Sequence, residues 1–527
     1  MGMNKKQQFL KQKLLEGKIK ILPESKVLSI CFIIGVLFEL LFLVLLLVLA
    51  VLPFKYIIAV VAVLFVVDWA ILHLFHKRHS YPKRIIGLIV LMLVMNVLLI
   101  GDSYVYSTYE TLQKISKFHD TWEIYDVVAL KGGSYNTIDD AKGKTIAVVD
   151  MESKQLTEAK ERLVTGYDVK YDEKTNMIDV GRTVLSDDGQ KQDNLIMVTR
   201  PNHKMINKQI KGFKANTQTI YSMKVRKRAD DHAKRIDVTE ESFNVLISGK
   251  DVWGDLKDKD GLSDVNMVMT VNPKTKEILL TSIPRDSYVP LHTSGQLDKL
   301  THTGIYGEDE TRQTIEDFLD IDINYSITVN FSMLRDIVDA IDGIDVYSDY
   351  AFKSAISEYE YVEGWNHLMG KPALYFARER KAFAEGDMQR NKNQQKVLKA
   401  TIHKVTSSKV ILTRYTSILD AVDDEMYTDM SDSDLKKLVR LTLRNMDANW
   451  KVHTVNIKGG TGMAPCYSMG NMELSCVFPS DESVEKAKEA IHRTMYPVDN
   501  TIQTETTTQT ESTTQPESTT QTEPAEE

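Results

Sequence analysis

The chain has 527 residues, which is enough for two or three domains, and a formal net charge of −8. Residues 498–527 hold seven acids and neither Lys nor Arg, so the rest of the chain carries a charge of about −1. This balance excludes the strongly basic character that would point to nucleic acid, and no nucleic-acid partner is expected.

Three apolar runs near the N-terminus predict three transmembrane helices within residues 27–101, namely Val27–Leu52, Ile57–Phe75 and Ile85–Ile100. The first two reach the ~20 residues that a helix needs to cross a bilayer. The third is slightly short, but Gly101 and the residues after it can extend it. A cleaved signal peptide is not expected, because the first run is too long and lacks a small-residue cleavage site.

The basic residues beside these runs predict the orientation of the chain in the membrane. Residues 1–26 carry seven lysines and the loop at 76–84 carries four Lys and Arg residues, whereas the loop at 53–56 carries only Lys55. The N-terminus and the second loop are therefore expected in the cytoplasm, and everything after about Gly101 outside the cell. A substrate that needs cytosolic ATP is not expected for the outer region.

Beyond the membrane, composition and apolar pattern divide the chain into segments. We predict a helical stalk at 102–125, a small α/β accessory domain at 126–235, a second α/β domain at 240–405, a C-terminal part of the outer region at 406–497 and a disordered Thr-, Glu- and Gln-rich tail at 498–527. The basic stretch at 224–235 is interpreted either as a solvated linker or helix face, or as a contact for anionic lipid or wall polymer.

Strand-like and helical runs alternate in the second α/β domain. The strand-like runs are 243–248, 265–272, 278–284 and 325–330, and the helical runs include 309–320 and 331–341. This alternation predicts helices that cover both faces of a central sheet.

Acidic and basic side chains follow the ends of these strands. Asp251 comes after the first strand and Asp264 precedes the second, so the two carboxylates can converge on one divalent ion; Asp in a turn is the alternative interpretation. Arg285 ends the third strand, where α/β sheets usually bind ligands. An ion pair of Arg285 with Asp286 is its alternative.

A cluster of arginines between 375 and 395 indicates a polyanionic phosphate ligand, because guanidinium groups bind phosphate through two parallel hydrogen bonds. Arg378 and Arg380 share a face only on extended backbone, so we expect a helix to end there. Arg390 and Gln394 are four residues apart and share a face of a following helix. A solvated charged helix face is the alternative.

Two cysteines lie on the predicted outer side of the membrane. Cys466 and Cys476 are ten positions apart in a loop-like segment, and an oxidising compartment makes a disulfide between them an expectation, with two free thiols as the alternative. Cys31 lies in the first apolar run. No His or third Cys lies close to the pair in the sequence, so a metal site is not expected there.

The motifs taken together resemble the LytR–CpsA–Psr family over about residues 240–405. They are GKD at 249–251, SD at 263–264, IPRD at 283–286, DKLTHTGIYG at 298–307, DINYSITVNF at 322–331, DGIDVYSDYAF at 342–352, ARER at 377–380 and RNKNQQ at 390–395. With three apolar runs and an accessory region, the chain is similar to streptococcal-type capsule-associated members of that family.

The resemblance implies a central mixed β-sheet flanked by helices and a phosphotransferase at the outer face of a Gram-positive cell membrane. Such an enzyme joins a glycopolymer from an undecaprenyl-pyrophosphate carrier to peptidoglycan through a phosphodiester. Other capsule-assembly proteins are further candidate partners. The motif positions imply that Asp251 and Asp264 hold Mg²⁺, with Mn²⁺ as the alternative, and that one of them can be the base. The implied pyrophosphate-binding residues are Arg285, Lys299, Arg378, Arg380, Arg390 and Gln394.

Two positions depart from the pattern of many family members. Leu262 stands where many carry Arg before the Ser-Asp pair, and Asn393 stands where many have a second Arg. Either change is expected to weaken phosphate affinity or alter the acceptor. Two other functions stay open at this point: a non-enzymatic membrane-anchored regulator of capsule synthesis, and a polyprenyl-pyrophosphate-binding pyrophosphatase.

Overall fold

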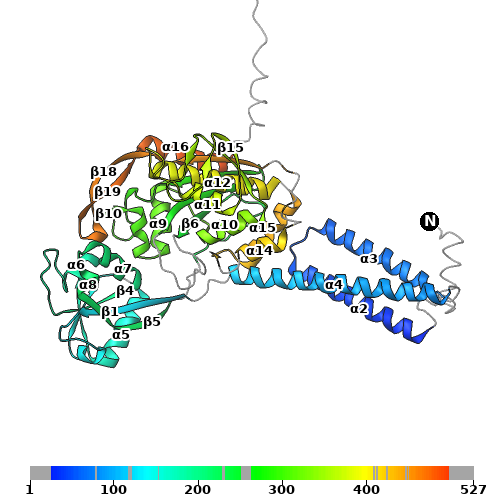
Figure 1. Cartoon of the computed structure of the whole chain (residues 1–527), viewed down its shortest axis with the longest axis horizontal. Helices are drawn as coiled ribbons and strands as arrows, with labels where there is room; N and C mark the ends of the chain where they lie inside the picture. The colour runs from blue at the N-terminus through cyan, green and yellow to red at the C-terminus, as the bar shows by residue number, and fades with distance from the viewer. Residues whose placement is uncertain are drawn as a thin grey trace, which may run out of the picture.

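The computed structural model describes residues 25–497 except for 77–79, 117–120, 152, 228–231, 251–262, 408–409, 411–413, 423–424, 446–447 and 449. The described part consists of an arm of three long helices and two sheet-containing units (Figure 1).

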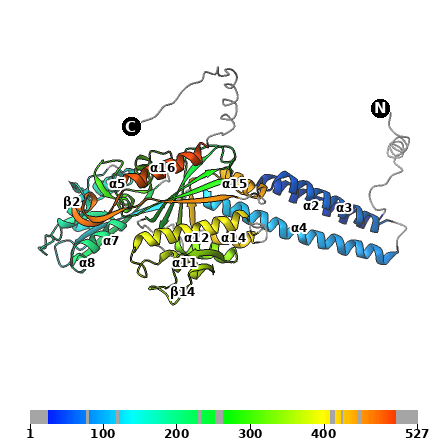
Figure 2. The same ribbon diagram turned by 90° about the horizontal axis from the view of Figure 1, so that it is seen from above.

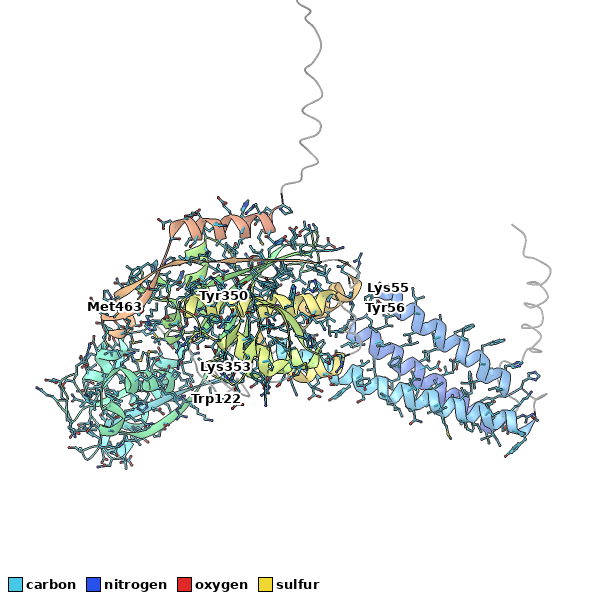
Figure 3. All side chains as sticks on the ribbon, turned by 45° about the horizontal axis from the view of Figure 1, so that its top comes forward. Lys55, Tyr56, Trp122, Tyr350, Lys353 and Met463 are labelled. Carbon is cyan, nitrogen blue, oxygen red and sulfur yellow. The ribbon has the colours of Figure 1, made fainter. Side chains whose placement is uncertain are left out.

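The helical arm corresponds to the three predicted spans. Its helices are α2 (Lys26–Leu49), α3 (Phe54–Leu74) and α4 (Tyr81–Ser116), and all three are long and apolar enough to cross a membrane. Lys55 and Tyr56, in the loop predicted to lie outside, are at the end of the arm beside the α/β units (Figure 3). The loop that holds Lys55 and the α/β units thus lie at the same end of the arm.

The 36-residue helix α4 continues past the apolar run and packs against the outer region. Val105 and Leu112 of α4 share a core with Leu443 of α15 (Asp432–Arg444), and Arg440 of α15 donates a hydrogen bond to the carbonyl of Ala50. The predicted stalk is thus a helix as far as Ser116, whereas a strand already begins at Thr121. The α/β region thus packs directly against the end of the helical arm.

The first sheet belongs to the accessory region and has the strand order β3-β2-β4-β1-β5. Its strands are β1 (Thr121–Leu130), β2 (Thr145–Val149), β3 (Lys170–Lys174), β4 (Leu195–Thr199) and β5 (Thr217–Lys227). Helix α5 (Lys154–Tyr167) covers one face, and α6 (Met177–Arg182), α7 (Arg200–Gln209) and α8 (Phe213–Asn216) cover the other. Side chains of β1 alternate between these two cores, as a strand buried on both faces requires.

The second sheet has six strands in the order β16-β11-β6-β7-β8-β17. The strands are β6 (Phe243–Lys250), β7 (Ser263–Asn272), β8 (Glu277–Ile283), β11 (Tyr325–Asn330), β16 (Met426–Thr428) and β17 (Lys451–Asn456). β6 pairs in parallel with β11 and β8 with β17, and the other pairs are antiparallel. The predicted mixed sheet is confirmed, and it includes two strands from beyond residue 405.

Helices cover both faces of this sheet, as the alternating pattern predicts. Helices α9 (Glu308–Leu319) and α16 (Asp481–Met495) pack on the face that holds Leu246 and Val268. Helices α12 (Asp387–Ser407) and α15 pack on the opposite face, which holds Val245 and Met267. Figure 2 shows α16 and α12 on opposite sides of the strands. The pairing brings the ends of β6 and β8 and the start of β7 to one edge.

Smaller elements surround this edge of the sheet. A satellite core combines α10 (Phe331–Ala340), α11 (Gly370–Arg378), β12 (Ile344–Ser348), β13 (Phe352–Lys353), β14 (Glu360–Tyr361), β15 (Gly364–Leu368) and α14 (Tyr415–Val422). β9 (Tyr288–Pro290), β10 (Leu297–Lys299) and the short helix η2 (Leu300–Ile305) follow β8.

The hairpin of β18 (Gly459–Cys466) and β19 (Met472–Pro479), with η3 (Tyr467–Met469) between them, connects the two units. Ala464 and Cys466 lie in the same core as Ile206 and Phe213 of the accessory region. Figure 1 shows β18 and β19 beside α6 of the accessory region. At its other end, the amide of Val477 donates a hydrogen bond to the carbonyl of Asp286 just beyond β8. The hairpin therefore links the accessory sheet to the edge of the six-stranded sheet.

Candidate phosphate-binding site

Asp264 and Arg285 lie opposite each other at the edge where β7 begins and β8 ends. The strand register pairs Asn266 with Ile283, so its continuation aligns Asp264 with Arg285, and the two side chains form an ion pair. Burial alone would lower the pKa of Arg285, but the charges of Asp264 and Asp286 outweigh burial and raise it. Arg285 is therefore a fixed cation at the end of a strand, as predicted.

Asp286 and Lys299 extend this line of alternating charges. Lys299 Nζ is 3.2 Å from Asp286 Oδ1, and Asp286 Oδ2 is 3.7 Å from Arg285 Nε. The ion pair with Asp286, which was the alternative interpretation of Arg285, is present together with the pair to Asp264. Lys299 reaches the site from β10, as the DKLTH motif implied.

Arg390 brings a second guanidinium group to the same place from the first turn of α12. Its side chain is 8% exposed, and Arg390 Nη2 is 2.7 Å from Asp387 Oδ1. Burial lowers the pKa of Arg390, and the positive charges of Arg285 and Arg380 lower it further against the opposing effect of Asp387. Arg390 Nε has no hydrogen-bond partner among the described residues. Cations crowded together in this way can be relieved by an anionic ligand.

Arg378 and Arg380 lie where α11 gives way to extended backbone, as predicted. α11 ends at Arg378, whose guanidinium lies 4.3 Å from the centre of the Phe331 ring, and Glu379 has extended backbone angles. Arg380 is exposed. Of the two arginines, Arg380 lies close enough to Arg390 for its charge to lower the pKa of Arg390.

Glu379, between the two arginines, is the functional residue that sequence reasoning missed. Its side chain is completely buried, and its Oε1 accepts the amide protons of Arg380, Lys381 and Ala382. Its Oε2 accepts hydrogen bonds from the hydroxyl and amide of Ser354 and Ala355 at 2.7 Å each. Burial raises the pKa of Glu379, but these hydrogen bonds outweigh burial and lower it. The carboxylate therefore fixes the turn that presents Arg380.

Gln394 and its two neighbours on α12 have different surroundings. Gln394 is half-buried on α12, one turn after Arg390. Gln395 Nε2 instead donates to the carbonyls of Leu280 and Val455, at 3.0 Å and 2.7 Å, and anchors α12 to β8 and β17. The sequence gives no signal for this division of roles between adjacent glutamines.

Asn393 is buried at 1% exposure and does not face the arginines. Its Nδ2 donates to the carbonyl of Phe376 at 3.2 Å, and its Oδ1 accepts from Gln389 at 3.0 Å. The departure from the family pattern at this position thus ties α12 to α11. Leu262, the other departure, and Asp251, a predicted metal ligand, lie outside the described residues.

Oxygen ligands near Asp264 fit a hard cation such as Mg²⁺. Asn266 is on the same face of β7, is 1% exposed, and neither its amide oxygen nor its nitrogen has a hydrogen-bond partner among the described residues. Mg²⁺ uses one or two carboxylates together with phosphate oxygens and water. A carboxylate beside an unsatisfied amide oxygen can supply such a partial ligand set.

The two outer cysteines come together, but the structure leaves both as free thiols. Their sulfur atoms are 3.8 Å apart, and both side chains are buried. The disulfide stays a prediction. The expectation that no histidine lies near the pair was wrong, because Asp298 and His302 pack against Cys466 from a segment far away in the sequence.

The region is an α/β domain whose mixed sheet gathers basic side chains at the ends of its strands, where α/β sheets usually bind ligands. The model of the LytR_cpsA_psr family matches residues 205–493, which is more than half of the chain. The chain belongs to this family.

The curated relatives include several polyisoprenyl-teichoic acid–peptidoglycan teichoic acid transferases. The polyisoprenyl-teichoic acid–peptidoglycan teichoic acid transferase TagU of Enterococcus faecalis is 36% identical over 200 residues, which are 38% of this chain and 65% of that protein. The protein of the same name from Bacillus cereus is 36% identical over 211 residues, or 39% of this chain and 68% of that protein. Among solved structures, the crystal structure of Bacillus subtilis TagV has 28% sequence identity to this chain and a TM-score of 0.40. The match covers 49% of this chain and 98% of that chain.

Proposed function

We propose that this chain is an extracytoplasmic phosphotransferase of the cell membrane. It would transfer a capsular polysaccharide or another wall glycopolymer from an undecaprenyl-pyrophosphate carrier to peptidoglycan and form a phosphodiester. The observation that carries the proposal is the cluster of basic side chains at one edge of the six-stranded sheet, in which Arg390 is buried beside Arg285 and Arg380. The names of the relatives support a lipid-linked glycopolymer and peptidoglycan as the substrates.

The charges at this edge suit a pyrophosphate diester. The basic side chains brought together at this edge are Arg285, Lys299, Arg380 and Arg390, and the carboxylates beside them are Asp264, Asp286 and Asp387. The two negative charges of such a diester would pair with these basic groups. Arginine also offers paired N–H groups that match the oxygens of phosphate.

The reaction that we propose is the attack of a wall-sugar hydroxyl on the phosphorus attached to the glycopolymer. A new O–P bond forms, and the bond from that phosphorus to the bridging oxygen breaks, so lipid monophosphate leaves. The arginines would stabilise the charge that develops on the bridging oxygen, and a carboxylate would accept the hydroxyl proton. Catalysis of this kind depends on positioning and electrostatics more than on covalent intermediates.

Mg²⁺, with Mn²⁺ as the alternative, is the metal that we propose for this site. Asp264 would hold the ion, with Asp251 as the second predicted carboxylate and Asn266 as a neighbouring amide ligand. The ion would supply charge neutralisation at the pyrophosphate oxygens. Asp264 pairs with Arg285 through one carboxylate oxygen, Oδ1, and the other oxygen would hold the ion.

Reconstitution tests the proposal. Full-length protein in detergent would be incubated with lipid-linked oligosaccharide pyrophosphate, Mg²⁺ and wall fragments, and wall-bound sugar and lipid monophosphate would be measured. Both products are expected from the wild type, and Arg378→Ala and Asp264→Ala are expected to lose both. The control is Lys353→Ala, at an exposed ion pair with Glu360.

The products also separate the proposal from its alternatives. Free phosphorylated sugar with no wall-bound sugar would show a pyrophosphatase. No turnover by the wild type, with capsule levels changed in cells, would show a regulator. Full activity in either site variant would overturn the assignment of the site.

A further inference from the structure

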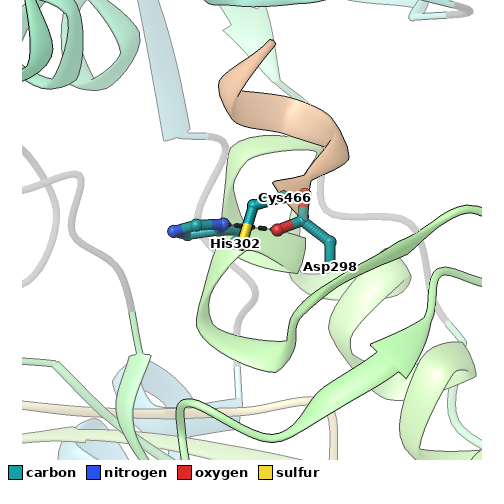
Figure 4. Close-up of side chains that lie close together, drawn as sticks. All are labelled: Asp298, His302 and Cys466. Carbon is teal, nitrogen blue, oxygen red and sulfur yellow. Dashed lines mark hydrogen bonds and ion pairs between the residues drawn. The ribbon is translucent and has the colours of Figure 1, made fainter. Parts of the chain in front are cut away.

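A second group of ligand-type side chains lies away from the arginines, at the junction of the hairpin with β10. Asp298, His302 and Cys466 are all buried, and one potential ligand atom of each lies within 4.8 Å of the other two. Figure 4 shows the imidazole, the carboxylate and the sulfur directed toward one another from two segments of the chain. The cluster combines nitrogen, oxygen and sulfur donors, which is the set that Zn²⁺ prefers.

A second sulfur adjoins this cluster. Cys476 Sγ is 3.8 Å from Cys466 Sγ, and Cys476 is 1% exposed. Two thiolates on a tetrahedral Zn²⁺, each with a bond of about 2.3 Å, are about 3.8 Å apart. The four side chains thus include the number and the types of ligand that a closed zinc site needs.

The pairing of the hairpin favours a bridging ion over a disulfide. Cys466 is opposite Met472 and Cys476 is opposite Gly462, so the two cysteines are four positions out of alignment. A disulfide needs sulfurs about 2.05 Å apart and closely placed Cα atoms. A metal ion bonds to each sulfur separately and does not need a direct bond between the two sulfurs, so it tolerates the offset better.

The hydrogen bonds within the cluster are also compatible with the binding of an ion. His302 Nδ1 is 2.6 Å from Asp298 Oδ1, while Asp298 Oδ2 accepts the amide proton of Ser468 at 2.7 Å. Binding of an ion would replace the hydrogen bond between His302 and Asp298 and release the two thiol protons. The bond from Ser468 would still orient the carboxylate, as partners of metal ligands commonly do.

We propose that Cys466, His302, Asp298 and Cys476 form a structural site for a divalent ion of the zinc type. Its place in the fold indicates its role. Cys466 and Cys476 belong to the core shared with the accessory region, while Asp298 directly precedes Lys299 of the phosphate site. The ion would tie the accessory region to the segment that carries Lys299.

Metal analysis of the full-length protein in detergent tests this site without an activity assay. After loading with Zn²⁺ and removal of the excess, we expect about one Zn²⁺ per chain by mass spectrometry of the metal. Cys466→Ser and His302→Gln are expected to weaken binding at least about 100-fold, because changes outside the ligand set alone typically cost about 10–100-fold. Cys31→Ser, in a membrane helix, is the matched control and should bind normally.

Co²⁺ provides a second measurement that reports the ligands directly. Co²⁺ in place of Zn²⁺ should give the thiolate-to-metal charge-transfer absorption, which Cys476→Ser should reduce and Cys466→Ser and Cys476→Ser together should abolish. Circular dichroism of each variant would check its folding. The proposal would be overturned if the wild type contains no metal after loading and has either a Cys466–Cys476 disulfide or three free thiols.

Discussion

The accessory sheet and the six-stranded sheet both bury charged side chains, but the two sheets differ in whether those charges have partners. In the accessory sheet, Asp126 is 4% exposed and is satisfied by Arg200, His203 and Ser222. In the six-stranded sheet, Arg390 is 8% exposed, lies beside other cations and keeps an N–H group without a partner among the described residues.

This difference distinguishes a charge that supports the fold from one that awaits a ligand. A buried charge with all of its partners makes the structure depend on it, because removing it leaves those partners unsatisfied. A buried cation repelled by its neighbours contributes little to folding and gains its partner when an anion binds. Substitutions in the two regions should therefore separate stability from activity.

The largest effect is expected for Arg390→Gln. Loss of this guanidinium should lower the rate of glycopolymer transfer about 10²–10³-fold, as loss of one electrostatic contact to a transition state typically does. Unfolding should change little, since the lost pair with Asp387 is offset by relief from burial and from Arg285 and Arg380. Transfer assays measure the rate and thermal unfolding measures the stability. A large loss of stability with a proportionate loss of activity would contradict the contrast between the two sheets.

Asp126→Asn should show the reverse behaviour. Charge-assisted hydrogen bonds from Arg200 and Ser222 are lost, and the free energy of unfolding of the accessory unit should fall by about 2–3 kcal/mol. Hydrogen exchange at β1 and β5 of the full-length protein reports this change, and exchange in β7 and β8 is the internal control. Transfer activity at a temperature where the variant stays folded should be close to wild type.

The sequence predicted the sheet, and the local positions of several candidate site residues, because those features are local. Apolar alternation marked β6, β7, β8 and β11, and the change from helix to loop after Arg378 followed from the two-residue spacing of Arg378 and Arg380. The positions of the strand ends in the sequence only indicated that Asp264 and Arg285 could be close. The register of β7 and β8 in the structure makes them neighbours.

The features that the sequence did not predict depend on contacts between distant segments. Glu379 resembled one more charge on a solvated face, although Ser354 and Ala355, 25 and 24 residues earlier, make it a buried acceptor. The proximity of His302 to Cys466 likewise depends on how the hairpin folds back. Spacing in the sequence carries no information about either contact.

Glu379→Gln tests whether the turn between the two arginines positions them. A neutral amide keeps one oxygen acceptor but cannot accept all five hydrogen bonds, so Arg380 should be held less firmly. We expect about a 10-fold loss in kcat with a smaller change in KM, since a well-oriented contact contributes most in the transition state. Glu385→Gln, at an exposed pair with Lys392 on the same loop, is the control and should leave both constants unchanged.

The smallest expected effect is a loss of stability of the accessory sheet at acid pH, which depends on the charge of Asp126. It is small near neutral pH and is the effect most specific to this sheet. Burial raises the pKa of Asp126, but hydrogen bonds from His203, Arg200 and Ser222 outweigh it and lower the pKa to about 2 from 3.8. A lowered pKa means that the stabilisation is complete above pH 3.8 and is lost as the pH falls from 3.8 toward about 2. Hydrogen exchange at β1 and β5 should accelerate across this window in the wild type beyond any change in Asp126→Asn. Equal acceleration in both proteins would show that Asp126 does not stabilise the sheet through its charge, and the contrast with Arg390 would then be lost.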